Sequence, residues 1–259
     1  MRDTGLNDAI AAAGGIGALA RKIGIAQPSL SKWTRVPAER VVAVETATGI
    51  DRSILRPDLY GAAVPSADAV DDVDAARAQE YALLATLLAR APDGALLQRL
   101  SRLTGDDSLL GQAHAALAEG ATQVTAEAVE REYHDLFIGV GRGEFLPYAS
   151  YYLTGFLYER PLANLRGHLA RLGLERAVDQ SEPEDHIAIL CEIMSGLAGG
   201  RYVAAKDADR ELFEAHLSPW APRLFKDLER AERADFYRHV GKLGRVFMDI
   251  ETEAFTLPS

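Results

Sequence analysis

Residues 182–197 read EPEDHIAILCEIMSGL, and this stretch decides the fold class of the chain. Pro183 and the neighbouring acids are typical of a first helical turn, where proline loses no hydrogen bond and negative charge meets the positive end of the helix dipole. After His186 the apolar residues fall three or four positions apart, the spacing of one buried helix face. They are Ile187, Leu190, Cys191, Met194 and Leu197. The stretch therefore predicts a helix that begins near Ile187.

The same helical spacing recurs on both sides of this stretch. One set is Val129, Tyr133, Leu136, Phe137 and Val140, and the other is Phe236, Val240, Leu243, Phe247 and Ile250. Residues 77–102 are rich in Ala, Leu and Arg, which favour helices. The alternating pattern of strands is scarce. We therefore predict an all-α chain.

Charge is unevenly divided along the 259 residues, whose net charge is −10. Residues 1–60 hold eight Lys/Arg and six Asp/Glu, so the remainder carries the whole acidic excess. The first segment can therefore approach phosphate, whereas the rest is repelled by it. A single cysteine excludes an internal disulfide, and no apolar run approaches the roughly 18 residues of a membrane span. The N-terminus also lacks the apolar core of a signal peptide. We expect a cytoplasmic protein with no membrane insertion.

A boundary is expected where the sequence offers little to bury. Residues 61–74 read GAAVPSADAVDDVD, which is small, acidic and rich in turn-formers. We therefore predict a domain at residues 1–60, a linker at 61–76 and a second domain at 77–259.

The first domain has the pattern of a helix-turn-helix. Helices are expected at residues 4–13, 16–23, 27–34 and 37–48, with Gly24 in the turn between the second and third. Leu30 and Trp33 would point the third helix into a small core. The residues left facing outward have side chains that bind base edges or phosphates. They are Gln27, Ser29, Ser31, Lys32 and Arg35.

This segment resembles the Cro/YdaS-like helix-turn-helix family. The resemblance rests on the stretches LARKIGI at 19–25, QPSLSKW at 27–33 and RPDLY at 56–60. It implies binding to double-stranded DNA. Since one module offers a small interface, useful specificity would call for a homodimer. The alternative is a helical cap whose polar face is only solvated.

In the second domain, no catalytic group of residues and no metal-ligand spacing stands out. The glycine-rich residues 139–143 follow a helix rather than a strand and lack the Lys-Ser/Thr of a phosphate loop, so a plain loop is expected. Aromatic rings gather nearby, at Tyr133, Phe137, Tyr148, Tyr151 and Tyr152. Such rings can line a peptide groove or can be ordinary core.

This domain resembles the TorD/DmsD family of redox-enzyme maturation chaperones from about Arg77 to Ile250. The resemblance rests on Tyr133-x-x-Leu136-Phe137, Pro147-Tyr148-x-Ser150-x-Tyr152, Glu182-Pro183-x-Asp185-His186, Pro219-Trp220 and Phe236-Tyr237. It implies an all-helical chaperone, not an enzyme, that binds a molybdoenzyme catalytic subunit or its twin-arginine signal peptide. It requires no cofactor, although weak guanine-nucleotide binding occurs in the family. The implied client site is Tyr133, Leu136, Phe137, Pro147, Tyr148, Tyr152, Glu182, Pro183, Asp185 and His186.

Two other functions stay open at this stage. The chain could be a transcription regulator whose helical domain senses another ligand. It could also be a nucleotide hydrolase that uses Asp185 and His186, although adjacent residues do not face one another on a helix. The leading interpretation is a chaperone whose DNA-binding module couples client occupancy to transcription.

Overall fold

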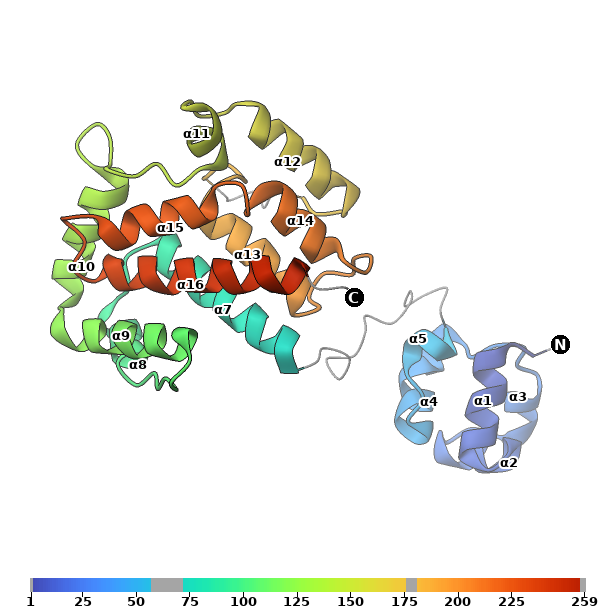
Figure 1. Cartoon of the computed structure of the whole chain (residues 1–259). Helices are drawn as coiled ribbons and strands as arrows, with labels where there is room; N and C mark the ends of the chain where they lie inside the picture. The colour runs from blue at the N-terminus through green and yellow to red at the C-terminus, as the bar shows by residue number, and fades with distance from the viewer. Residues whose placement is uncertain (1, 57–71, 176–180, 257–259) are drawn as a thin grey trace. The chain divides into compact units, whose positions relative to one another are not determined.

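A computed structural model describes residues 2–56, 72–175 and 181–256. The chain divides into two compact units, one before and one after residue 70. Within the described ranges the regular structure is helical and there are no strands, so the predicted all-α class is confirmed (Figure 1).

The N-terminal unit is a cluster of short helices around its own core. They are α1 (Thr4–Ala13), α2 (Ile16–Lys22), α3 (Gln27–Ser31), the 3-10 turn η1 (Ala38–Arg40), α4 (Val41–Thr48) and α5 (Arg52–Leu55). Leu6, Leu19, Leu30, Val44 and Leu55 are fully buried together. The part of the predicted family stretch at residues 57–60 lies outside the described residues, as does the predicted linker from 61 to 71.

Two of these helices are shorter than the sequence predicts. Helix α3 ends at Ser31 because the N–H groups of Lys32 and Trp33 bond to carbonyls three residues back, which tightens the turn. The segment predicted at 37–48 is split into a 3-10 turn and α4, whose end is capped by Gly49 with φ +73°.

The C-terminal unit is built from longer helices. They are α7 (Asp72–Ala89), α8 (Gly94–Leu100), α9 (Leu109–Gln123), α10 (Ala126–Tyr133), the π-helical turn η3 (His134–Ile138), α11 (Ala149–Thr154), α12 (Arg160–Arg171), α13 (Ile187–Ala198), α14 (Ala208–His216), α15 (Ala221–Arg230) and α16 (Tyr237–Thr256). Helix α7 thus begins at Asp72, before the predicted domain start at residue 77. Helix α13 begins at Ile187, as the deciding stretch predicts.

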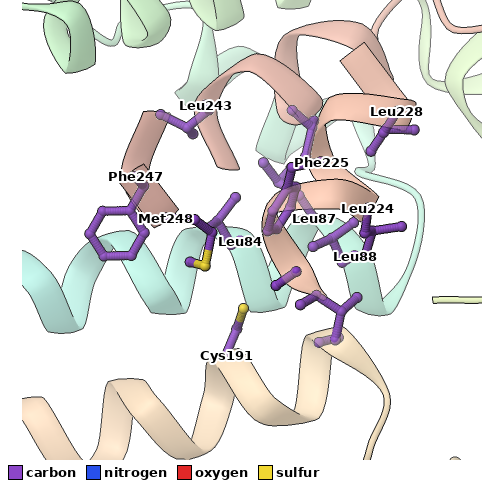
Figure 2. Close-up of a cluster of buried hydrophobic side chains, with 14 of the residues drawn as sticks. Leu84, Leu87, Leu88, Cys191, Leu224, Phe225, Leu228, Leu243, Phe247 and Met248 are labelled. Atoms are coloured by element: carbon purple, nitrogen blue, oxygen red, sulfur yellow. The ribbon is translucent and has the colours of Figure 1, made fainter. Parts of the chain in front are cut away.

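The core lies where α7 packs against α13 and α15 packs against α16. Figure 2 shows side chains of all four helices in one buried cluster, among them Leu84, Cys191, Phe225 and Phe247. The α15–α16 contact is close because α16 carries glycines: a Cβ on Gly241 would lie 2.4 Å from the backbone N of Glu229. A cysteine buried in this cluster behaves as a small apolar residue.

Two apolar positions predicted to be buried are exposed. Val140 is fully exposed, since Gly139, with φ +62°, ends the helical run before it. Ile250 is 40% exposed, and its neighbour Glu251 is buried instead. Glu251 turns inward because Arg77 and the Tyr81 hydroxyl bind its carboxylate at 2.8–2.9 Å.

Replacing Arg77 with Met tests this buried ion pair. Arg77 also bonds Asp74 and Asp209, so it joins α7, α14 and α16. The variant leaves Glu251 buried without its cation, and we expect the free energy of unfolding to fall by about 3 kcal/mol. Urea denaturation measures this loss. Arg210→Met, which breaks the exposed Arg210–Glu214 pair on α14, is the control and should cost about 0.5 kcal/mol. Equal losses in the two variants would contradict the role given to Arg77.

Candidate functional site

Two segments that are distant in sequence pair at the start of α11 and α13. Tyr148 and His186 form an isolated antiparallel bridge. The Ala149 N–H donates to the Asp185 carbonyl at 3.0 Å, and the Ile187 N–H donates to the Pro147 carbonyl at 2.9 Å. The structure therefore brings together Pro147, Tyr148, Asp185 and His186, as the predicted client site requires.

Asp185 fixes this junction with its side chain as well as its backbone. It is 1% exposed, and its Oδ2 accepts the Ser150 N–H at 2.9 Å. A buried carboxylate is stable only when it is hydrogen-bonded in this way. Asp185 thus holds the first turn of α11 against the start of α13.

Glu184 anchors a neighbouring helix to the same segment. Its carboxylate is mostly buried and binds the Arg166 guanidinium through three contacts of 2.8–3.1 Å. Arg166 lies on α12, so α12 is tied to the segment before α13. Glu184 is therefore already neutralised by a cation of this chain.

His186 is the N-cap of α13. Its Nδ1 accepts the Ala188 N–H at 3.1 Å, and its ring meets the Tyr148 ring edge to face with centroids 4.9 Å apart. Burial lowers the pKa of His186 to about 4, against the opposing effect of Glu182 and Asp185. The ring is neutral at pH 7, as its role as an acceptor needs. His186 Nδ1 and the Asp185 carboxylate each accept one backbone N–H, and these bonds fix the two side chains in place.

Glu182 is the acid of this segment that faces solvent. The Tyr148 hydroxyl donates to its Oε2, and burial, followed by the Glu182 carboxylate, raises the pKa of Tyr148 above its usual range. No Lys, Arg or His among the described residues forms an ion pair with Glu182. Its negative charge is therefore available to a cation from outside the chain.

A hollow of about 480 Å³ adjoins these groups along α7 and α13. Tyr133, Glu182 and His186 line it, together with small side chains of the two helices. Its remaining lining residues are Ala82, Ala85, Thr86, Ala89, Arg90, Ala188, Ile189, Glu192, Ser195 and Arg201. The predicted site did not include Arg90, Glu192, Ser195 or Arg201. The sequence gives little indication that these four residues line a site, because each is an ordinary polar residue next to the apolar positions of a buried helix face.

The other predicted client residues lie deeper or elsewhere. Leu136 is fully buried, and the Phe137 ring packs edge to face on Tyr237 at 5.3 Å. Tyr133 lies between this cluster and the hollow: its ring is 5.7 Å from that of Tyr237, and its hydroxyl donates to the Leu88 carbonyl at 3.2 Å.

Tyr152 and Pro183 complete the predicted set. The half-buried Tyr152 packs on Trp220 with ring centroids 5.4 Å apart. Pro183 is half-buried, and its carbonyl accepts the His186 N–H at 3.1 Å. Pro183 thus shapes the turn into α13. Tyr152 lies away from the hollow and is not one of its lining residues.

The described residues contain neither a cluster of metal ligands nor a membrane-spanning helix. Across the described ranges no group of three or more His, Cys, Asp or Glu side chains is placed to hold a metal ion. In the same ranges no helix is long and apolar enough to cross a bilayer.

The N-terminal unit places all five of its predicted DNA-contact residues on the surface. Gln27, Ser29, Ser31, Lys32 and Arg35 are exposed. Leu30, between them, is fully buried, and Trp33 is half-buried against the same core. The short helix α3 therefore has one apolar side inside and a polar side outside.

Comparison with known families matches each unit separately. Residues 104–226 match the family described as nitrate reductase delta subunit, and residues 6–64 match the family described as bacterial toxin YdaS. The chain combines a TorD-like segment with a YdaS-like one. The predicted resemblances to both families are confirmed.

The similar curated proteins are chaperones by name. Chaperone protein TorD of Aliivibrio fischeri is 26% identical over 135 residues, which cover 47% of this chain and 61% of the relative. TorD of Shewanella loihica is 26% identical over 203 residues, covering 69% of this chain and 92% of the relative. A Haemophilus influenzae protein named "Probable Tat proofreading chaperone DmsD" is 29% identical and covers 44% of this chain and 56% of its own length. The chain thus spans about three fifths of the first of these relatives.

His186, the N-cap of α13, makes the stability of the protein depend on pH. Its ring is protonated near pH 6.5 in the unfolded chain and near pH 4 in the folded chain. Its contribution to the free energy of unfolding is therefore full above pH 6.5 and is lost as the pH falls toward 4. His186→Asn keeps a cap acceptor but does not titrate.

We expect the variant's free energy of unfolding to fall less steeply between pH 6.5 and 4 than that of the wild type. The difference in slope should be about one proton, or about 1.4 kcal/mol per pH unit. Urea denaturation at a series of pH values measures both slopes, and parallel curves would show that His186 does not titrate as the structure indicates.

Proposed function

We propose that this protein is a chaperone that binds an immature redox-enzyme subunit, a molybdoenzyme catalytic subunit in the first instance, through its twin-arginine leader or unfolded body. The client site is the hollow along α7 and α13 with Tyr133, Tyr148, Glu182 and His186 around it. The names of the relatives support the chaperone role, and one of them refers to proofreading on the Tat route.

The observation that carries the proposal is the position of Glu182. It is exposed, held by the Tyr148 hydroxyl and unpaired by any described cation, beside a hollow large enough for peptide side chains. An arginine guanidinium can donate two hydrogen bonds to such a carboxylate. Arg90 and Arg201, which also line the hollow, can donate to the carbonyls of a bound peptide.

Titration of the protein with a synthetic twin-arginine leader peptide tests this proposal. Glu182→Gln keeps the Tyr148 contact but removes the charge, so we expect affinity to fall about tenfold at low salt and less at high salt. Glu253→Gln, an exposed glutamate of α16 that does not line the hollow, should bind like the wild type. An affinity unchanged by Glu182→Gln would reject this carboxylate as the arginine site.

We also propose that the N-terminal unit binds double-stranded DNA through α3 and couples client binding to transcription. Support comes from the five exposed polar residues around the buried Leu30 and from the match to the YdaS family. If the helical unit senses some other ligand, the protein is a transcription regulator of a different kind, and DNA binding is common to both alternatives.

Selection from a random pool of DNA duplexes, followed by affinity measurement, tests the second proposal. Gln27→Ala and Lys32→Ala should each weaken binding to the selected duplex by about 1–3 kcal/mol, because each removes a base or phosphate contact. Asp8→Ala, on the exposed side of α1, is the control and should not weaken it. If the full chain enriches no duplex, the DNA-binding function is excluded.

A further inference from the structure

Four exposed apolar side chains gather where α11 passes into α12. Leu153, Phe156, Leu157 and Tyr158 are 45%, 70%, 38% and 72% exposed. Single exposed apolar residues are common on soluble proteins, but several within six positions form a patch of the kind that marks a binding surface. We call these four residues the α11–α12 patch.

The backbone under the patch is held in place. Gly155, with φ +84°, ends α11, and the Thr154 Oγ1 accepts the Phe156 N–H at 3.2 Å while it donates to the Ser150 carbonyl at 2.8 Å. Tyr158 has φ +61°, which costs a non-glycine residue about 1 kcal/mol. The chain thus tolerates strain in a conformation that leaves the Tyr158 ring in solvent.

The patch lies close to the segment that carries Glu182. Helix α11 starts at the Asp185–Ser150 contact, and α12 is tied to Glu184 through Arg166, so both flanks of the patch are fixed to the segment that carries Glu182. Tyr158 lies near enough to Tyr148 to act on its pKa, after burial and the larger effect of Glu182. The open carboxylate, the Tyr148 ring and the patch therefore neighbour one another.

We propose that the α11–α12 patch binds the apolar segment that follows the arginines of a client leader, an inference that rests on the proposed chaperone function. Export leaders have a positively charged start followed by 7–15 apolar residues. Glu182 complements the charged part of such a leader, and the patch complements the apolar part. A peptide of this kind fits both features, whereas an acidic peptide without apolar residues fits neither.

Calorimetric titration with two synthetic peptides tests the inference. One peptide carries two arginines followed by an apolar segment, and the other has that segment replaced by Ser and Gly. The double variant Phe156→Ser, Tyr158→Ser should lose about tenfold in affinity for the first peptide and bind the second like the wild type. The control Ile138→Ser, Val140→Ser removes apolar residues that are 55% and 102% exposed elsewhere, and it should bind both peptides normally. Melting temperatures should be unchanged, because the altered side chains of the patch are mostly in solvent.

Each other outcome has a definite meaning. If Glu182→Gln weakens binding but the patch variant binds the first peptide like the wild type, the patch proposal fails and the chaperone proposal stands. If the wild type binds neither peptide, both fail. If sedimentation shows a wild-type dimer that the patch variant dissociates, with peptide affinity unchanged, the patch is a contact between two copies and the inference is overturned.

Discussion

The site depends on the buried carboxylate of Asp185. One oxygen receives the Ser150 N–H at the start of α11, and the backbone carbonyl of the same residue receives the Ala149 N–H. Because an uncompensated charge at this depth would be costly, the two segments are obliged to meet. The meeting sets the Tyr148 ring against His186 and places Glu182 within reach of the Tyr148 hydroxyl. A backbone contact made for stability thereby positions the residues that face the hollow.

The buried acidic side chains and Glu182 differ in the groups that bind their carboxylates. This difference distinguishes the acids that stabilise the fold from the one that can bind a ligand. The Asp185 carboxylate is satisfied by the Ser150 N–H, Glu184 by Arg166, and Glu251 by Arg77 and Tyr81. Glu182 receives only the neutral Tyr148 hydroxyl among the described residues and remains exposed. In a chain with a net charge of −10, an open carboxylate beside a hollow is more informative than the overall acidity.

Helical periodicity predicted the fold class and the start of α13, because buried stripes leave a direct trace in sequence. It failed at Val140 and Ile250, where the outcome depends on a glycine that ends the helix and on an ion pair that draws Glu251 inward. The proximity of Tyr148 and His186 came from family resemblance rather than from spacing, since long-range backbone pairing has no local period. Leu136 and Phe137 also belong to the motifs that carry the family resemblance, but they pack in the core, where the Phe137 ring contacts Tyr237. The α11–α12 patch was not predicted, because Gly155 ends α11 and the apolar residues that follow it lie outside any helix.

Hydrogen–deuterium exchange of the full chain, with and without a saturating twin-arginine leader peptide, tests the central claim most directly. Amides gain protection where a ligand covers or rigidifies the backbone. The account predicts new protection in residues 147–158, in 181–192 and on the hollow-facing side of α7. Protection confined to the α15–α16 face, with these segments unchanged, would contradict it.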